Sequence, residues 1–304
     1  MSRRIAVTGA SGFIGRHLVA HLAAGGDQVV PVRRPFEPST LLETLQGADA
    51  VVHLAGVVSA LREQDYFVAN VDGTRAVAAA ARTAGIPLIH ISSLAAAGPA
   101  SPRAPRSEDE ANAPINAYGR SKLDGEREVA ALDGLRWTIL RPGVVYGPGD
   151  RALLPVFRLA ARGLLPLVGR ADAAYTFIHI ADLLRVITAA IDTPAAGDIL
   201  FAGHPQPVTT RALLEGVRDA AGVRAAIVPI PLGVTRLAAF AGDAAGALLG
   251  RRTVINSRRY AELASEGFVC RVDRLRDRLG VVARMDLRDG LADACAWYRK
   301  QGWL

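Results

Sequence analysis

The chain has 304 residues, half of them hydrophobic, and a formal net charge of +7. A chain of this size and composition can bury a substantial core, so it should fold as one large domain or two modest ones. No run of about 18 or more apolar residues lacks a charge, which excludes a membrane span. The two cysteines, Cys270 and Cys295, have neither CxxC spacing nor a neighbouring histidine cluster, which argues against a metal site or a disulfide framework and favours a reducing, cytoplasmic setting.

Arginine carries nearly all of the positive charge, because only Lys122 and Lys300 among the 36 basic residues are lysine. The basic residues are scattered through the chain and no run of five occurs, so we expect no nucleic-acid partner. The excess positive charge instead favours an anionic cofactor or substrate.

The first two hundred residues alternate short β-branched runs with longer segments rich in Ala, Leu and Arg. This is the pattern of parallel strands joined by crossover helices. Strands are predicted at residues 5–8, 28–32, 50–54, 88–91, 137–140 and 198–201. Helices are predicted at residues 13–24, 66–84, 118–131 and 182–191. The predicted fold class is α/β, with a doubly wound parallel sheet of the Rossmann type.

The remaining segments predict a loop and a second lobe. Residues 98–114 are rich in Pro, Ser and charge, which predicts a long loop, and such a loop is often a lid. After residue 201 the strand–helix rhythm weakens, and we expect helices at 211–220, capped by Thr209 or Thr210, and at 287–299. We therefore predict a dinucleotide-binding domain of residues 1–145 and 176–202, and a smaller, mainly helical substrate lobe of residues 146–175 and 203–304.

A glycine-rich segment, TGASGFIG at residues 8–15, lies between the first predicted strand and the first predicted helix. Glycines at this junction let the backbone turn tightly and approach a pyrophosphate at the helix N-terminus. We expect cofactor contacts from Gly9, Ser11, Gly12, Phe13, Ile14 and Gly15.

The end of the second predicted strand bears on the choice of cofactor. An NAD site normally has Asp or Glu there, to accept a hydrogen bond from the ribose 2′-hydroxyl. Here the strand is followed by Arg33 and Arg34, whose guanidinium groups suit a 2′-phosphate. Solvated loop charges in an arginine-rich chain are the alternative interpretation. We expect NADP(H) to be preferred, with NAD(H) as the second choice.

A tyrosine and a lysine, Tyr118 and Lys122, stand four residues apart and so lie on one face of a predicted helix. At this spacing an ammonium group can stabilise a phenolate. A compact ammonium can also donate to ribose hydroxyls, which the planar fork of an arginine does poorly. Ser93 ends the fourth predicted strand, and the carboxyl ends of parallel strands are where an open α/β sheet binds ligands. Ser93, Tyr118 and Lys122 are the candidate catalytic residues.

Seven motifs in this order resemble the extended short-chain dehydrogenase/reductase family, also called the NAD-dependent epimerase/dehydratase family. They are TGASGFIG at Thr8, DAVVHLAG at Asp49, NVDGT at Asn70, ISS at Ile91, YGRSK at Tyr118, LRPGVVYGPGD at Leu140 and FIHIADL at Phe177. The resemblance covers nearly the whole chain.

The resemblance implies a mechanism. Tyr118 would be the general acid/base, Lys122 would orient the ribose and lower the pKa of the phenol, and Ser93 would hold the substrate oxygen. Hydride would pass between C4 of the nicotinamide and a substrate carbon. Further cofactor contacts are implied for Leu54, Ala55, Gly56, Asn70, Pro142 and Val144. For Asn70, support of the lysine through water and a purely structural role are equally good interpretations, and His53, His90 and His179 are interpreted as packing residues.

Three departures from the family pattern affect these expectations. Only 17 residues, Arg33 to Asp49, lie between the second and third predicted strands, too few for the extra strand of many relatives. Tyr175 stands where sugar-nucleotide epimerases often carry an arginine for the diphosphate, with Arg170 as a substitute. Ala97 replaces a tyrosine and should make the substrate wall smaller and more apolar.

The sequence therefore predicts an NAD(P)-dependent oxidoreductase that acts on a secondary alcohol or ketone of a small molecule. The leading hypothesis is nucleotide-sugar epimerase, dehydratase or ketoreductase chemistry. A reductase or dehydrogenase of an apolar substrate, similar to 3β-hydroxysteroid dehydrogenases and dihydroflavonol reductases, is nearly as well supported. A redox-sensing dinucleotide-binding protein without turnover is the third hypothesis, and the resemblance implies a homodimer through the helices that begin near Tyr66 and Tyr118.

Overall fold

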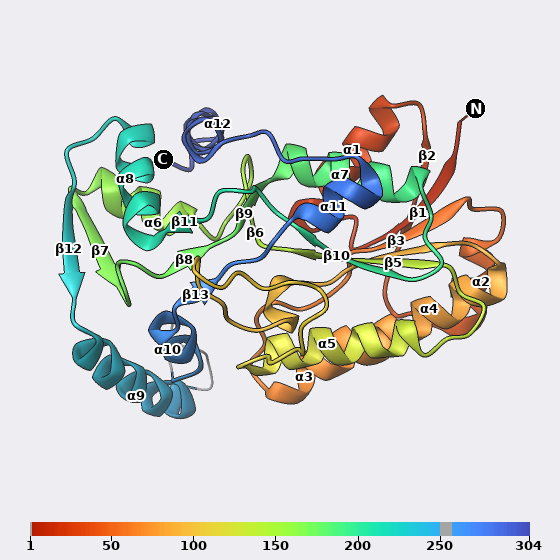
Figure 1. Ribbon diagram of the computed structural model, residues 1–304, viewed down its shortest axis with the longest axis horizontal. Helices are drawn as coiled ribbons and strands as arrows, with labels where there is room; N and C mark the ends of the chain where they lie inside the picture. The colour runs from red at the N-terminus through yellow and green to blue at the C-terminus, as the bar shows by residue number, and fades with distance from the viewer. Residues whose placement is uncertain (1, 250–256) are drawn as a thin grey trace.

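The computed structural model describes residues 2–249 and 257–304, and its centre is a six-stranded parallel sheet (Figure 1). The strands are β1 (Arg4–Thr8), β2 (Gln28–Val32), β3 (Ala50–His53), β4 (Leu88–Ile91), β5 (Trp137–Pro142) and β10 (Asp198–Ala202). Their order across the sheet is β10-β5-β4-β3-β1-β2. The predicted α/β fold and all six predicted strands are confirmed, to within two residues at each end.

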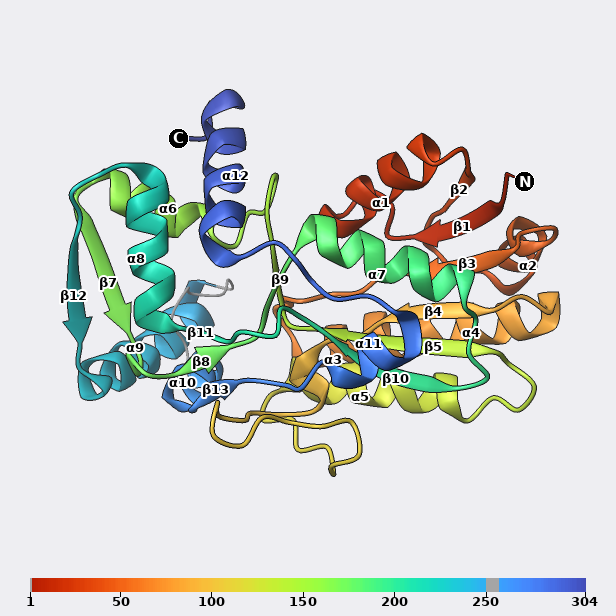
Figure 2. The same ribbon diagram turned by 45° about the horizontal axis from the view of Figure 1, so that its top comes forward.

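Helices cover both faces of the sheet (Figures 1 and 2). On one face lie α1 (Phe13–Ala24), α7 (Ile180–Asp192) and α11 (Asp273–Leu279), and on the other α2 (Pro38–Leu45), α4 (Gly73–Ala84) and α5 (Ala117–Ala130). Because side chains alternate along a strand, Ile5 and Val7 pack under the first group and Ala6 under the second. Strands buried on both faces explain the uninterrupted apolar runs in the sequence.

The segment predicted as one helix over residues 66–84 is a composite, so that prediction was wrong in detail. It consists of α3 (Glu63–Phe67), a π-helical turn η1 (Val68–Asp72) and then α4. The π turn places Asn70 where its side chain bonds the backbone of Val57, a contact that no local pattern reveals. π turns of this kind are frequent at functional sites.

The connection between β2 and β3 contains a helix, α2, that was not predicted from the sequence. Residues 33–49 contain α2 and no strand, as their small number predicts. The strand β2 is therefore an edge of the sheet.

The second lobe, expected to be mainly helical, also contains several short strands. β7 (Leu164–Val168) pairs with β12 (Ala226–Ile230), and β8 (Ala174–Tyr175) with both β11 (Val208–Thr209) and β13 (Gly267–Phe268). A further pair, β6 (Val144–Tyr146) with β9 (Phe177–His179), is formed mainly by residues assigned above to the dinucleotide-binding domain. The helices are α6 (Leu154–Ala161), α8 (Thr210–Ala221), α9 (Leu232–Leu249), α10 (Ser257–Ala264) and α12 (Leu287–Lys300). Apolar side chains of α6, α8 and α12, together with those of β7, form a core separate from the two beside the main sheet. In the described part of the chain, no helix has the length and apolar character needed to cross a membrane.

The long segment 98–114 is attached to the rest of the molecule at several places. The backbone of Arg106 pairs with residues 269–271, which follow β13. Glu108 accepts a hydrogen bond from the backbone N–H of Phe201 at 2.9 Å, at the carboxyl end of β10. These contacts hold the loop against the edge of the sheet from which the predicted site residues emerge.

Candidate active site

The carboxyl edge of the sheet collects the predicted site residues. In the parallel register Thr8 lies beside Val32 of β2 and beside His53 of β3. β2 and β3 therefore lie on opposite sides of β1, so the strand order reverses at β1. Such a switch point is where an open α/β sheet binds ligands.

The glycine loop at this point is shaped by close backbone contacts. Gly9 has φ +68°, and a Cβ atom on it would lie 2.8 Å from the backbone nitrogen of Ala55. A Cβ on Gly15 would lie 2.1 Å from the carbonyl oxygen of Gly9. The N-cap of α1 is Gly12, so no side chain at this position bonds the first N–H groups of the helix. The first turn also contains no acidic residue, and these N–H groups are therefore open to an anion. This cradle fits a pyrophosphate.

Beyond β3, Ala55 and its neighbours Leu54 and Gly56 close the other side of the loop. The backbone N–H of Ala55 donates to the Thr8 hydroxyl at 3.1 Å, and that hydroxyl bonds Nδ1 of His53 at 2.7 Å. Burial lowers the pKa of His53 to about 3, helped by Lys122, so the ring stays neutral. His53 is thus a buried packing residue that links Thr8 to Thr74, in agreement with its interpretation from the sequence.

Asn70 is held by protein groups on all sides. Its Oδ1 accepts from the N–H of Val57 at 2.8 Å, and its Nδ2 donates to the Val57 carbonyl at 3.0 Å and to the Ser121 hydroxyl at 2.9 Å. These bonds join the segment after β3 to helix α5. Of the two interpretations left open by the sequence, this geometry favours the structural one.

Helix α5 carries Tyr118 and Lys122 and approaches its neighbours at backbone distance. A Cβ on Gly119 would lie 2.4 Å from the carbonyl oxygen of Ala95, and a Cβ on Gly125 would lie 2.3 Å from that of Asn70. Glycines inside a helix cost about 1 kcal/mol each relative to alanine, so their presence here reflects this close packing. The two contacts set the helix against the turn that carries Ser93 and against the π turn.

Lys122 is fully enclosed at the end of β4. Its Nζ donates to the carbonyl oxygen of Ile91 at 2.7 Å. Burial lowers the pKa of its ammonium to about 8, opposed by the carboxylate of Glu126. The half-buried ring of Tyr118, one turn earlier, lies 6.2 Å from the ring of Tyr66 between centroids.

Ser93 follows β4 and caps the short 3-10 helix η2 (Leu94–Ala96). Its Oγ accepts from the N–H of Ala95 at 3.2 Å, which leaves the hydroxyl proton able to donate to another oxygen. Ala97 is buried against Phe201 and Cys270, so it belongs to a small core behind this turn. The expectation that Ala97 forms part of the substrate wall was therefore wrong.

The segment after β5 has its N–H groups bonded within the protein. Pro142 is buried, and the N–H groups of Gly143 and Val144 are bonded to the carbonyls of Ala202 at 3.0 Å and Thr176 at 2.8 Å. A cofactor could meet only carbonyl groups or side chains here. The side chain of Val144 is exposed at the carboxyl edge of the sheet.

Arg33 and Arg34 are exposed immediately after β2. Within the described residues neither guanidinium forms an ion pair or a hydrogen bond. The charge of Arg34 nevertheless reaches buried His53, whose pKa is lowered first by burial, next by Lys122 and then by Arg34. Both arginines are thus available to an anion beside the glycine loop.

Tyr175 and Arg170, the residues considered for a substrate diphosphate, belong to the segment predicted as the substrate lobe, and His179 follows in β9. Tyr175 of β8 stacks on Phe268 of β13, with ring centroids 6.4 Å apart. Arg170 is paired with Asp172 at 2.8 Å in an exposed turn, so it is engaged within its own segment. His179 caps α7 and lies 3.4 Å from a carboxylate oxygen of Asp293, a packed position.

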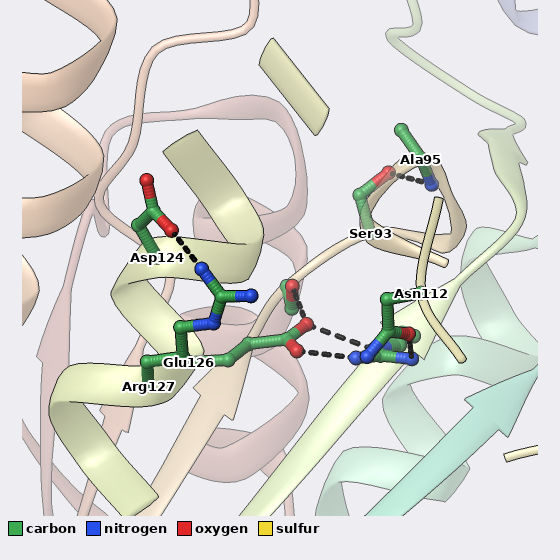
Figure 3. A network of polar contacts seen from close by, with 8 residues as sticks. Ser93, Ala95, Asn112, Asp124, Glu126 and Arg127 are labelled. Atoms are coloured by element: carbon green, nitrogen blue, oxygen red, sulfur yellow. Dashed lines mark hydrogen bonds and ion pairs between the residues drawn. The ribbon is translucent and has the colours of Figure 1, made fainter. Parts of the chain in front are cut away.

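A polar cluster next to Ser93 was not predicted from the sequence. It consists of the buried residues Ser92, Glu126 and Arg141 and of the exposed Asn112, which accepts a hydrogen bond from Arg141. Figure 3 labels Asn112 and Glu126. Glu126 stands four residues beyond Lys122 on the same helical face, which was a usable signal. In a charge-rich helix, however, a glutamate is normally assigned to solvent.

A parallel doubly wound sheet with a glycine cradle at its switch point defines a dinucleotide-binding α/β protein. The chain belongs to the NAD dependent epimerase/dehydratase family, because the model of that family matches residues 5–202.

Individual relatives match nearly the full length. A ceramide reductase of Caulobacter vibrioides is 31% identical over 99% of this chain and 96% of its own. A 4-hydroxy-2-methyl-3-oxo-4-farnesyl-3,4-dihydroquinoline-1-oxide ketoreductase of Stigmatella aurantiaca is 27% identical over 95% of this chain and 94% of its own. The structure of RMD from Pseudomonas aeruginosa complexed with NADPH has a TM-score of 0.77 and 25% identity, and the match covers 99% of each chain. The protein is an NAD(P)-dependent oxidoreductase of this family.

Proposed function

We propose that the protein interconverts a ketone and a secondary alcohol on an apolar small molecule, with NADP(H) as its preferred cofactor. When bound, the nicotinamide supplies or accepts the hydride. Tyr118 donates a proton to the carbonyl oxygen during reduction, and the hydroxyl of Ser93 holds that oxygen. Lys122 keeps a positive charge one helical turn from the phenol, which favours the phenolate left after proton donation.

The residues that would hold the dinucleotide are those of the cradle. The first turn of α1 faces the pyrophosphate, and Gly9, Gly12 and Gly15 leave room for it. Arg33 and Arg34 lie where a 2′-phosphate would be recognised, which supports the choice of NADP(H).

Arg33→Ala should weaken NADPH binding about 10- to 150-fold and leave NADH binding nearly unchanged. One charge-assisted hydrogen bond contributes roughly 1.5 to 3 kcal/mol, which corresponds to that range. Titration of both cofactors against wild type, Arg33→Ala and the double variant with Arg34→Ala measures it. The advantage of NADPH should also shrink with added salt, because the arginines are exposed. A wild type that binds NADH as tightly as NADPH would overturn the cofactor preference.

The apolar substrate is supported above all by the side chains around the carboxyl edge. Val58 and Leu61 after β3, Ile115 before α5 and Val144 in β6 are all exposed. The relatives named for a ceramide and for a farnesylated quinoline act on substrates with long apolar chains, in agreement with such a rim.

The arginines that stand next to Leu61 and close to Tyr118 in the sequence are already engaged, which disfavours a diphosphate at this rim. Arg62 pairs with Asp65 at 2.8 Å, and Arg120 pairs with Glu63 at 2.7 Å. Tyr175 stands where sugar-nucleotide epimerases often carry an arginine. A nucleotide sugar would therefore have to displace existing ion pairs.

A series of 3-oxo compounds of increasing alkyl length tests the substrate class. Each buried methylene contributes about 0.8 kcal/mol, so kcat/KM should rise up to about fourfold per added carbon until the site is filled. Initial rates of cofactor oxidation measure this, with a UDP-4-keto sugar as the competing substrate. Faster turnover of the UDP sugar, without any dependence on chain length, would reject the apolar assignment.

A matched pair of variants localises the effect. Val144→Asp should reduce kcat/KM for the longest ketone at least about tenfold, because it places a charge against an apolar chain. Val282→Asp is the control, since Val282 is 39% exposed and Val144 37%. Equal losses in the two variants would argue against the proposed rim.

We also propose a homodimer and a cytoplasmic location. The family resemblance supports the first and the low cysteine content supports the second. Light scattering of the purified protein would refute the dimer if it gave the mass of one chain.

A further inference from the structure

A buried ion pair joins Glu126 of α5, which Figure 3 labels, to Arg141 of β5. Glu126 of α5 receives hydrogen bonds from Nε of Arg141 at 2.9 Å and from Nη2 at 2.5 Å. The two side chains are only 3% and 1% exposed. Replacing such a pair by apolar residues is often neutral or stabilising, so a contribution to stability alone does not explain it.

The glutamate end of this pair reaches the candidate site by two routes. Tyr118, Lys122 and Glu126 follow one another at four-residue spacing, so they share one face of α5. The hydroxyl of Ser92 donates to Oε1 of Glu126, and Ser92 immediately precedes Ser93. Glu126 therefore contacts the chain on one side of the site and shares a helical face with the proposed acid and its lysine on the other.

The arginine end reaches the loop of residues 98–114. Nη1 of Arg141 donates to Oδ1 of Asn112 at 2.8 Å. The next residue, Ala113, donates its N–H to the carbonyl of Ala97 at 2.9 Å, and a Cβ on Gly98 would lie 2.2 Å from the carbonyl oxygen of Ala113. The loop thus returns against the turn that begins at Ser93.

We propose that Asn112, Arg141 and Glu126 are positioning residues that hold this loop in register with the catalytic side chains. None of them is assigned a contact with substrate or cofactor. They act through Ser92 on the direction of the Ser93 hydroxyl and through Glu126 on the charge of Lys122. The inference rests on the proposed roles of Ser93 and Lys122.

Asn112→Ala in the full chain is the first test. Asn112 is exposed as a whole, so the fold should persist and the melting temperature should hardly change. We expect kcat to fall about 10- to 100-fold, the range that small misplacements of catalytic groups produce, while KM for the cofactor stays the same. Asn112→Asp should recover most of the loss, because its carboxylate accepts from the same Arg141 nitrogen.

The outer face of α5 offers a control. Asp124 pairs with Arg127 at 2.8 Å, and their side chains are 37% and 70% exposed. Figure 3 labels both on the helix of Glu126. Asp124→Asn should leave kcat unchanged. The proposal is overturned if Asn112→Ala keeps wild-type kcat, or if Asn112→Asp is as impaired as Asn112→Ala.

Glu126→Gln tests the other end with a pH profile. The titratable and charged groups around Lys122 are Tyr118 one turn earlier on α5, Glu126 one turn later with Arg141 beyond it, and the rings of His53 and His90. The pKa values of the two histidines are lowered by burial, so these rings stay neutral. Without the carboxylate, Lys122 should lose its proton at lower pH, so the alkaline fall of kcat/KM should move to lower pH. If Glu126→Gln folds and the alkaline fall of its kcat/KM stays at the wild-type pH, the proposal is contradicted.

Two further results complete the test. If Glu126→Gln does not fold, the Asn112 variants decide alone. Tyr118→Phe distinguishes failure of the proposed function from failure of the positioning proposal. Full activity of Tyr118→Phe refutes the proposed function. If Tyr118→Phe is inactive and Asn112→Ala is fully active, only the positioning proposal is refuted.

Discussion

Replacing Tyr118 with phenylalanine is expected to lower turnover by about 10²- to 10⁴-fold while cofactor affinity is retained. The substitution removes only the transferable proton. The ring should keep its place beside Tyr66, because that packing does not use the hydroxyl of Tyr118. Turnover at saturating substrate, together with a titration of NADPH binding, separates the two quantities.

Tyr298→Phe is the matched control. Its hydroxyl donates to the carbonyl of Asp150 at 2.7 Å in the core of the second lobe. Its loss should cost about 1 kcal/mol of stability without reducing turnover substantially. Undiminished turnover in Tyr118→Phe would rule out Tyr118 as the acid, and an equal loss in both variants would point to damage to the fold.

The sheet could be predicted because its signals are local and repeated. Each central strand is a short β-branched run followed by a longer amphipathic segment, and a βαβ unit has essentially one favoured handedness. The two-residue strands β8, β11 and β13 could not be predicted, since two residues show no periodicity. They exist because distant segments meet, as when Ala174 pairs with Gly267.

The candidate site divides in the same way. The glycine loop depends on spacing within eight residues, and the structure gives it the cradle that the spacing predicts. Tyr118 and Lys122 likewise share a helix. The packing of Gly119 on Ala95 and the ion pair of Glu126 with Arg141 depend on contacts between elements, so no stretch of sequence contains them.

The error at Ala97 has a clear cause. Ala97 was placed on the substrate wall because its position follows a strand end. In the structure Ala97 packs into a core, and at a second strand end the N–H of Val144 donates to Thr176. A position along the chain identifies the edge of the sheet but does not give the direction of a side chain or an N–H group.

Lys122→Arg is expected to lose most of the activity, about 10²-fold or more, although the charge is kept. Lys122 is enclosed, with Nζ 2.7 Å from the carbonyl of Ile91 and 3.9 Å from where a Cβ on Gly56 would stand. A guanidinium is larger and planar, so it cannot place a single donor at that point. Steady-state kinetics measure the loss.

Lys300→Arg is the matched control, because Lys300 is the other lysine of the chain and is exposed at the end of α12. It should retain full activity. If Lys122→Arg did so as well, Lys122 would have no specific role.

Burial adds a second readout, the dependence of folding stability on pH. The pKa of Lys122 falls from its ordinary 10.5 to about 8 in the folded protein, so the unfolded chain binds more protons between those values. The cost of burying the charge, about 3 kcal/mol from this shift, is present in full below pH 8 and is relieved as pH rises toward 10.5. Lys122→Arg stays charged throughout and should lack this gain, while Lys300→Arg should keep it. Urea unfolding at several pH values in this window measures the difference, and parallel curves for Lys122→Arg and wild type would show that Lys122 is not buried as a charge.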